Sequence, residues 1–212
     1  MRNLDFYQLA SERRSVRNFD VSRNLSIDEV TSILRAATKA PSAKNRQPWR
    51  FAIVTNSDMK ERIAHLMRMA ASEMGHRNVP HRILQLQIGS LLESAEILTD
   101  APCAVFVFCD SDSTWTGGNE AGWKLSLDDL QAVEMMGIGA CMQNAVLMAT
   151  SIGVASLWMC DVLYAADGIQ EELKTELPLV AAMLLGFEAD NEGEPRTERK
   201  HLEDSIIWND MV

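Results

Sequence analysis

The chain has 212 residues, of which 47% are apolar, and a formal net charge of -10 at pH 7. This length and apolar content predict one domain with a substantial core. The sequence holds no uninterrupted apolar run of about 18 residues, and its N-terminus lacks the apolar core of a secretory signal. We therefore expect neither a membrane span nor export.

Positive charge is concentrated at the N-terminal end of this acidic chain. Residues 1–50 carry ten basic and five acidic side chains, whereas residues 51–212 carry 10 basic and 25 acidic ones. Non-specific binding of nucleic acid needs a broad basic surface. The distribution therefore argues against nucleic acid as a partner and favours a local site for one small anion.

The first 74 residues predict three helices and one strand. Apolar residues at helical spacing predict helices near 4–12, 26–40 and 57–74. Ser26 and Glu29 form a capping box ahead of the second helix, and Pro41 ends it. The stretch WRFAIVT, residues 49–55, has the composition of a strand.

The rest of the chain alternates between strands and helices. The continuous apolar run CAVFVFC, residues 103–109, predicts a strand buried on both faces. Residues 110–124 predict an exposed loop or lid, and residues 127–151 the most apolar, central helix. Strands at 153–159 and 179–187, a short helix at 165–178, a charged tail and a strand-like SIIW at 205–208 complete the pattern. This order indicates an α+β or α/β class with one core.

The cysteines and histidines predict no metal site. All four cysteines lie in apolar stretches without a zinc or redox spacing: Cys103, Cys109, Cys141 and Cys160. We interpret them as buried thiols of a reducing compartment, which makes the cytoplasm the expected location. The histidines at 65, 76 and 81 match no helical ligand pair and are expected on the surface.

The stretch SERRSVRNF contains a candidate anion-binding site. Arg13, Arg14 and Arg17 lie within five residues, and Ser15 stands between them. Guanidinium groups match phosphate oxygens in bidentate geometry, and a serine hydroxyl adds a donor. The alternative is a solvated helix end whose arginines interact with the helix dipole.

A second candidate element is the loop APSAKNRQPW, residues 40–49. Pro41 and Pro48 bracket it, and Ser42, Asn45 and Gln47 present donors and acceptors suited to a planar heterocycle. The alternative is an ordinary connection between a helix and a strand. The stretch GIGACM, residues 137–142, lacks the third glycine of a dinucleotide-binding loop, so we expect close helix packing there.

RRSVRNF and APSAKNRQPW together resemble the N-terminal signature of the nitroreductase family of FMN-dependent oxidoreductases. The tail RKHLEDSIIW resembles the closing segment of that family, with His201 where proline is usual. QNAVLMATSIGVASLWM resembles the family's core helix and flavin-facing strand. The resemblance covers nearly the whole chain and is weakest at 68–100 and 110–124.

The resemblance implies an α+β, nitroreductase-like fold with a central, mostly antiparallel sheet flanked by helices, built as an intertwined homodimer. Residues 1–212 would form a single FMN-binding domain. Residues 110–125 would form a lid, and residues 190–212 would embrace the partner. In the lid, Trp115 and Trp123 could shape the acceptor pocket; the alternative is that both only pack the loop. Two FMN molecules would lie at the subunit interface, each contacted by both chains.

The resemblance also implies which residues bind FMN. Arg13 and Ser15 would hold the phosphate together with Arg199 of the tail, and Arg196 would be a second tail contact. Arg14 and Arg17 would lie along the ribityl chain and the pyrimidine edge. The flavin ring would meet Trp158 and Met159 at its N5/O4 edge, and from the partner chain it would meet Pro41, Ser42 and Asn45.

The implied activity is hydride transfer from NADH or NADPH through flavin N5 to a nitroaromatic, quinone or related acceptor, by a ping-pong mechanism. No side chain need act as acid or base, because the flavin carries the chemistry. One alternative keeps the fold but performs reductive dehalogenation or flavin fragmentation. Another is a non-catalytic protein that binds FMN or senses redox state.

Overall fold

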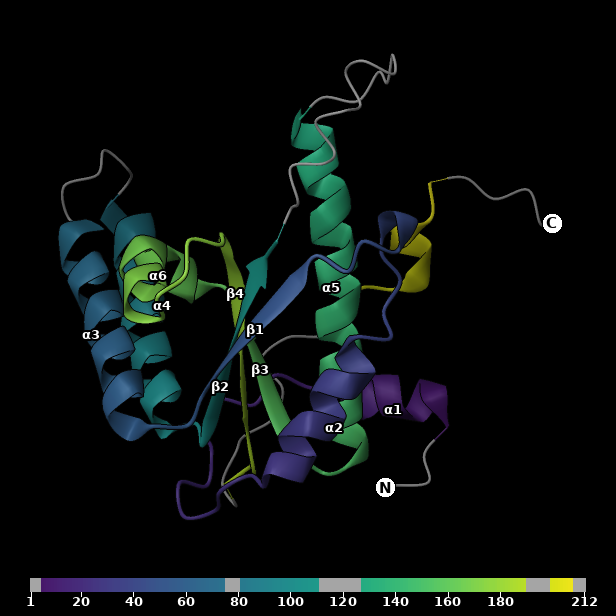
Figure 1. The fold of residues 1–212 in the computed structure, drawn as a ribbon, viewed down its shortest axis with the longest axis horizontal. Helices are drawn as coiled ribbons and strands as arrows, with labels where there is room; N and C mark the ends of the chain where they lie inside the picture. The colour runs from purple at the N-terminus through teal and green to yellow at the C-terminus, as the bar shows by residue number, and fades with distance from the viewer. Residues whose placement is uncertain (1–4, 75–80, 111–126, 190–198, 208–212) are drawn as a thin grey trace.

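The structure is a computed structural model that describes residues 5–74, 81–110, 127–189 and 199–207. Most of the predicted lid, with Trp115 and Trp123, lies outside these residues, as do Arg196 and His76. Figure 1 shows three layers, in which a central sheet is covered by α3, α4 and α6 on one face and by α2 and α5 on the other. The class is α+β, as predicted.

The four predicted strands form one antiparallel sheet in the order β1-β2-β4-β3. They are β1 (Trp49–Val54), β2 (Cys103–Cys109), β3 (Ala155–Met159) and β4 (Leu179–Gly186). Every residue of β2 is buried, which confirms the reading of its apolar run. Because β2 and β4 occupy the middle, β1 and β3 form the two edges of the sheet, where the chain can add further contacts.

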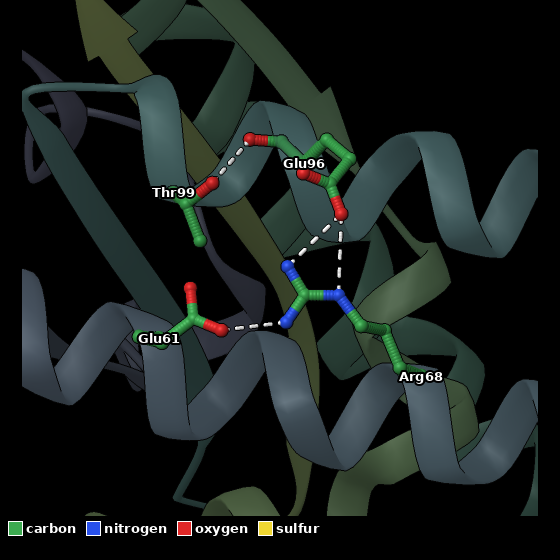
Figure 2. Close-up of polar contacts among 4 residues, drawn as sticks. All are labelled: Glu61, Arg68, Glu96 and Thr99. Atoms are coloured by element: carbon green, nitrogen blue, oxygen red, sulfur yellow. Dashed lines mark hydrogen bonds and ion pairs between the residues drawn. The ribbon is translucent and has the colours of Figure 1, made fainter.

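One face of the sheet carries α3 (Ser57–Glu73), α4 (His81–Asp100), the 3-10 segment η4 (Asp161–Ala165) and α6 (Ala166–Glu172). Helix α4 was not expected from the sequence. Figure 2 shows how it is tied to α3: Arg68 lies 2.7 Å from Glu61 Oε1 and 2.9 Å from Glu96 Oε1. The two carboxylates raise the pKa of Arg68, but all three groups reach solvent, so the network adds little stability.

The opposite face carries α2 (Ile27–Ala37) and α5 (Leu127–Ser151). The predicted capping box at the start of α2 is present, because Ser26 accepts from the Glu29 amide and Glu29 accepts from the Ser26 amide. Within the described residues, Gln131–Ser151 of α5 is long and apolar enough to cross a membrane by length and composition. In this fold it is the core helix, and Cys141, Met142 and Ala145 are fully buried against the sheet layer.

Both ends of the described chain are exposed. Helix α1 (Phe6–Glu12) buries none of its residues. The 3-10 segment η5 (Leu202–Ser205) is followed by Ile206 and the fully exposed Ile207. The prediction of a strand at SIIW is wrong for the part described, because Ser205 belongs to η5 and Ile206 and Ile207 pair with no strand of their own chain.

Candidate functional site

The segment that follows α1 runs along the β3 edge of the sheet. Arg13 ends the helix with an extended backbone (φ -62°, ψ 124°). Two residues later Ser15 forms a parallel bridge with Ser156, and the Val16 amide donates to the Ser156 carbonyl at 3.0 Å. The buried side chains of Val16 and Phe19 anchor the segment. The chain therefore places the arginine cluster beside β3.

This extended course distributes the arginines over two sides. Successive side chains of an extended segment alternate, so Arg13, Ser15 and Arg17 fall on one side and Arg14 on the other. Arg14 accordingly forms an ion pair with Glu188, just beyond β4. Alternation thus places three of the four predicted residues on one side, and the structure pairs Arg14 with a carboxylate.

The hollow on the Arg14 side has a volume of about 360 Å³. Its lining includes Glu12 and Glu188 as well as Arg14 and Arg23. Acidic and basic side chains are balanced there, so this hollow offers little net attraction to a phosphate. The Arg13 side is therefore the better candidate for anion binding.

Arg13 and Arg199 come together from opposite ends of the chain. Partial burial lowers the pKa of Arg13, and the positive charge of Arg199 lowers it further. Among the described residues, neither guanidinium forms an ion pair with an acid. Two cations held near each other favour an anion between them, and a phosphate matches guanidinium geometry.

Trp158 and Met159 lie at the end of β3 and point to opposite faces of the sheet. Met159 is buried against the layer of α3 and α4. Trp158 is 38% exposed, and its Cη2 atom lies 3.9 Å from the position that a Cβ on Gly139 of α5 would occupy. An exposed indole therefore lies on the α5 side of the same strand that Ser15 flanks.

The predicted loop Pro41–Asn45 contacts α5 at a different position. A Cβ on Gly137 would lie 3.3 Å from Ser42 Cβ and 3.6 Å from the Pro41 carbonyl oxygen. This close approach confirms that GIGACM serves packing. Two residues correspond to about 200° around an α-helix, so Gly137 and Gly139 face opposite sides of α5. In one chain, Ser42 and Trp158 are therefore separated by the helix.

That separation decides how the predicted residues can share a ligand. Arg13, Ser15, Arg17 and Trp158 lie along one edge of the chain, whereas Pro41, Ser42 and Asn45 dock on the far side of α5. A single flavin could meet both groups only if the second came from another chain. The geometry is consistent with the expected split of each site between two subunits.

Two polar anchors near the site were not expected from the sequence. Asp161, which follows the Trp158–Cys160 stretch, accepts hydrogen bonds from Ser90 at 3.0 Å and from Ser94 at 2.7 Å. These bonds fix the turn after β3 to α4. The second anchor is an ion pair between Glu134 and Arg46, which joins α5 to the Pro41–Pro48 loop.

All four cysteines are free thiols, but they differ in exposure. Cys103, Cys109 and Cys141 are buried as predicted. The prediction is wrong for Cys160, which is exposed because it lies just after the end of β3, where the chain leaves the sheet. Burial raises the pKa of Cys103 to about 11 and that of Cys141 to about 12, so both are protonated thiols at neutral pH.

The described residues contain no group of three or more His, Cys, Asp or Glu side chains placed to hold a metal ion. His65 and His201 are exposed. The groups gathered beside β3 are cationic and aromatic, and they suit an anionic, aromatic ligand.

The nitroreductase family profile matches residues 10–187, and the chain belongs to this family. It is 45% identical over 62 residues to the putative NAD(P)H nitroreductase YdgI of Bacillus subtilis (strain 168), covering 29% of this chain and 30% of the relative. It is 30% identical over 112 residues to iodotyrosine deiodinase 1 of Homo sapiens, covering 50% of this chain and 37% of the relative. The chain thus spans about a third of the length of these two relatives.

Solved structures confirm the nitroreductase-like fold over almost the whole chain. The BluB-like flavoprotein from Clostridium difficile 630 superposes with a TM-score of 0.74 at 25% identity, covering 98% of this chain and 100% of the other. A nitroreductase with bound FMN from Desulfitobacterium hafniense DCB-2 gives 0.69 at 20% identity, covering 96% and 97%.

Proposed function

We propose that this chain is an FMN-dependent oxidoreductase that passes a hydride from NADH or NADPH to a nitroaromatic, quinone or related acceptor by a ping-pong mechanism. The observation that carries the proposal is the pair Arg13 and Arg199, two cations without an acidic partner among the described residues. Arg13 belongs to the segment whose Ser15 bridges β3, the strand that also carries the exposed indole of Trp158. Family membership and the FMN-bound relative support the choice of FMN as the anion.

In this proposal the residues of the chain bind and orient FMN. Arg13, Ser15 and Arg199 hold the phosphate, and Arg17 lies along the ribityl chain toward the pyrimidine edge. A cation near that edge stabilises negative charge on the ring and so raises the reduction potential. Arg14 takes part only if it leaves Glu188, since the two are paired in this structure.

Bound FMN supplies the hydride chemistry, accepting from the nicotinamide donor and delivering to the acceptor. The protein contributes orientation, charge and backbone donors at the end of β3, where Trp158 and Met159 lie. We assign no side chain as general acid or base. The donor and the acceptor use the same exposed ring face in turn, which is why we expect ping-pong kinetics.

The same arrangement supports a homodimer as the functional unit. Pro41, Ser42 and Asn45 cannot reach the Arg13 edge within one chain, because α5 lies between them. Exposed apolar side chains on α1, α5 and the tail offer surface for a second copy: Phe6, Tyr7, Met136, Leu202 and Ile207. We also propose the cytoplasm as the location, on the basis of the four free thiols.

A second candidate is reductive dehalogenation on the same fold. The observation that favours it is the match to human iodotyrosine deiodinase 1 over half of this chain. Halide release from an iodinated phenol, measured with the flavin-loaded protein and a reductant, separates this activity from quinone reduction.

Steady-state kinetics test the leading proposal. The flavin-loaded protein should oxidise NADH or NADPH in the presence of a simple quinone, with parallel lines in double-reciprocal plots at several quinone concentrations. The proposal would be contradicted if the flavin-loaded protein oxidised neither NADH nor NADPH in the presence of a quinone, a nitroaromatic or an iodinated phenol. That result would favour a binding or redox-sensing role.

A further inference from the structure

Glu134 is a buried carboxylate in the most apolar helix of the chain. It is the only charged residue from Leu130 to Ser151. Its side chain is 6% exposed, and Oε1 lies 2.7 Å from Nε of Arg46, whose side chain is 16% exposed. A buried charge is unfavourable unless it is paired. Glu134 therefore acts on the Pro41–Pro48 loop through Arg46.

The loop that carries Arg46 has an unusual backbone. Lys44, Asn45 and Gln47 all have positive φ angles, of 52°, 57° and 53°, although none is glycine. Side chains with a Cβ rarely adopt this left-handed region, and such backbones persist only where their surroundings hold them. Hydrogen bonds from the Gln47 amide to Ser42 Oγ (2.9 Å) and from the Asn45 amide to the Ser42 carbonyl (3.0 Å) hold part of the turn.

Helix α5 supplies the rest of the support at two points. Ser42 packs directly over Gly137, and Arg46 is held by Glu134. Glu134 and Gly137 are three residues apart, so they lie on one face of the helix. The start and the end of the strained turn are therefore fixed to the same face of α5.

We propose that Glu134 is a positioning residue: through Arg46 it holds the strained turn in the shape in which Ser42 and Asn45 meet the flavin of the second subunit. Glu134 does not itself touch the flavin. This inference rests on the function proposed above, because it takes Ser42 and Asn45 as flavin contacts. It assigns a role to the buried charge of Glu134 and to the strained backbone at Lys44 and Gln47, none of which is among the proposed flavin contacts.

If the ion pair were purely structural, its removal would lower the stability of the protein without altering the flavin site. The test therefore compares FMN affinity, thermal stability and the visible circular dichroism of bound FMN in Glu134→Gln, Arg46→Gln and the double variant. Visible circular dichroism reports the surroundings of the ring. Ile63→Val, a cavity variant in the opposite layer, serves as the control for lost stability.

We expect each single variant to raise the Kd for FMN about tenfold, and the double variant, with two amides in place of two charges, to recover most of that loss. We also expect a changed circular dichroism band in Glu134→Gln and an unchanged one in Ile63→Val.

Two results would overturn the inference, and they are distinguishable. If the native protein binds FMN and Glu134→Gln binds it equally well with the native circular dichroism, the ion pair is structural only. If the native protein itself binds no FMN, the proposed function fails first. Should Glu134→Gln not fold, Arg46→Gln takes its place as the single variant, and its FMN affinity and circular dichroism are compared with those of the native protein and the double variant.

Discussion

Arg199 lies close enough to Arg13 for its charge to lower the pKa of the Arg13 guanidinium. The two residues belong to the first and the last described segments of the chain, and folding brings them within electrostatic reach of each other. Like charges repel, so this arrangement is most stable when an anion lies between them.

Arg13→Ala and Arg199→Ala should each weaken FMN binding. Loss of a charge-assisted hydrogen bond to phosphate is worth about 1.5–3 kcal/mol, which is roughly a 10- to 100-fold rise in Kd. Quenching of FMN fluorescence on titration measures this affinity. Arg35→Ala, an exposed arginine on α2, is the matched control and should bind FMN as the native chain does. Native FMN affinity in both Arg13→Ala and Arg199→Ala would show that the phosphate binds elsewhere.

Gly137→Ala should disturb the loop at Pro41–Asn45. The new Cβ would lie 3.3 Å from Ser42 Cβ, closer than an ordinary contact, so the loop must shift. We expect about a threefold to tenfold weaker FMN affinity and a free energy of unfolding about 1 kcal/mol below that of Gly89→Ala, because both variants gain helix propensity but only Gly137→Ala meets a close neighbour. Gly89→Ala is the control, because a Cβ there meets nothing within 4 Å. Equal effects of the two variants on FMN affinity would contradict the docking of this loop at the site.

Native protein should react with a thiol reagent at one cysteine per chain. Cys160 is exposed, whereas the other three thiols are buried, and burial raises the pKa of Cys103 and Cys141 to about 11 and about 12. The thiolate is the reactive form. Colorimetric titration should give one thiol per chain at pH 7.5 and four after denaturation, and Cys160→Ser should abolish the native reaction. Rapid labelling of a second thiol would show that the core opens.

Burial of Cys141 should make the fold less stable at alkaline pH. Its pKa rises from 9.0 in an ordinary setting to about 12 in the fold. Between these two values the folded thiol keeps its proton while the unfolded one ionises. The contribution of Cys141 to the free energy of unfolding is therefore complete below pH 9.0 and is lost as the pH rises toward 12. The loss is about 1.4 kcal/mol per pH unit in this window.

Denaturant melts at pH 8, 9 and 10 can isolate this contribution. Cys141→Ala has no thiol to ionise at this position, so its free energy of unfolding should fall less steeply with pH than that of the native chain. Parallel pH dependences in the two proteins would show that Cys141 does not ionise on unfolding.

Lys60 should stabilise the end of α4. Its buried ammonium donates to the carbonyls of Thr99 at 2.8 Å and Ala101 at 2.5 Å, and burial lowers its pKa. In Lys60→Met these carbonyls lose a charged donor, which should cost about 2–3 kcal/mol of stability. Thermal melts would detect this loss as a fall in Tm of roughly 2–4 °C per kcal/mol. FMN affinity should stay native, because Lys60 lies in the α3 layer; a large loss of affinity would contradict this.

Sequence pattern predicted the four strands and most helices because their signals are local, whereas the antiparallel sheet was implied only by the family resemblance. The run CAVFVFC reads as a buried strand from its composition, and Ser26 with Glu29 marks the start of α2 from spacing alone. Helix α4 (His81–Asp100) was not predicted from the sequence. The SIIW segment misled the prediction because β composition cannot say whether a strand has a partner within its own chain.

The arrangement of the candidate site was predictable in part. The resemblance implied that Arg13 and Arg199 share one site, and in the structure the charge of Arg199 reaches Arg13. The ion pair between Arg14 and Glu188 was not expected, because no motif links these two residues. Glu134 carried a signal that was overlooked, since it is a lone charge in an apolar helix.

Positive φ angles at Lys44 and Gln47 had no signal in the sequence, because neither is a residue type that favours the left-handed region. Asn45 is such a type, but residue type alone does not say that the turn uses it.

An absorbance spectrum of the purified, FMN-incubated protein, recorded before and after anaerobic addition of NADH and of NADPH, tests the central claim most directly. The account predicts a flavin spectrum that stays with the protein through gel filtration, bleaches with at least one donor and returns when a quinone or nitroaromatic is added. A protein that leaves the column colourless after incubation with FMN would contradict it, and Arg13 and Arg199 would then need another anion.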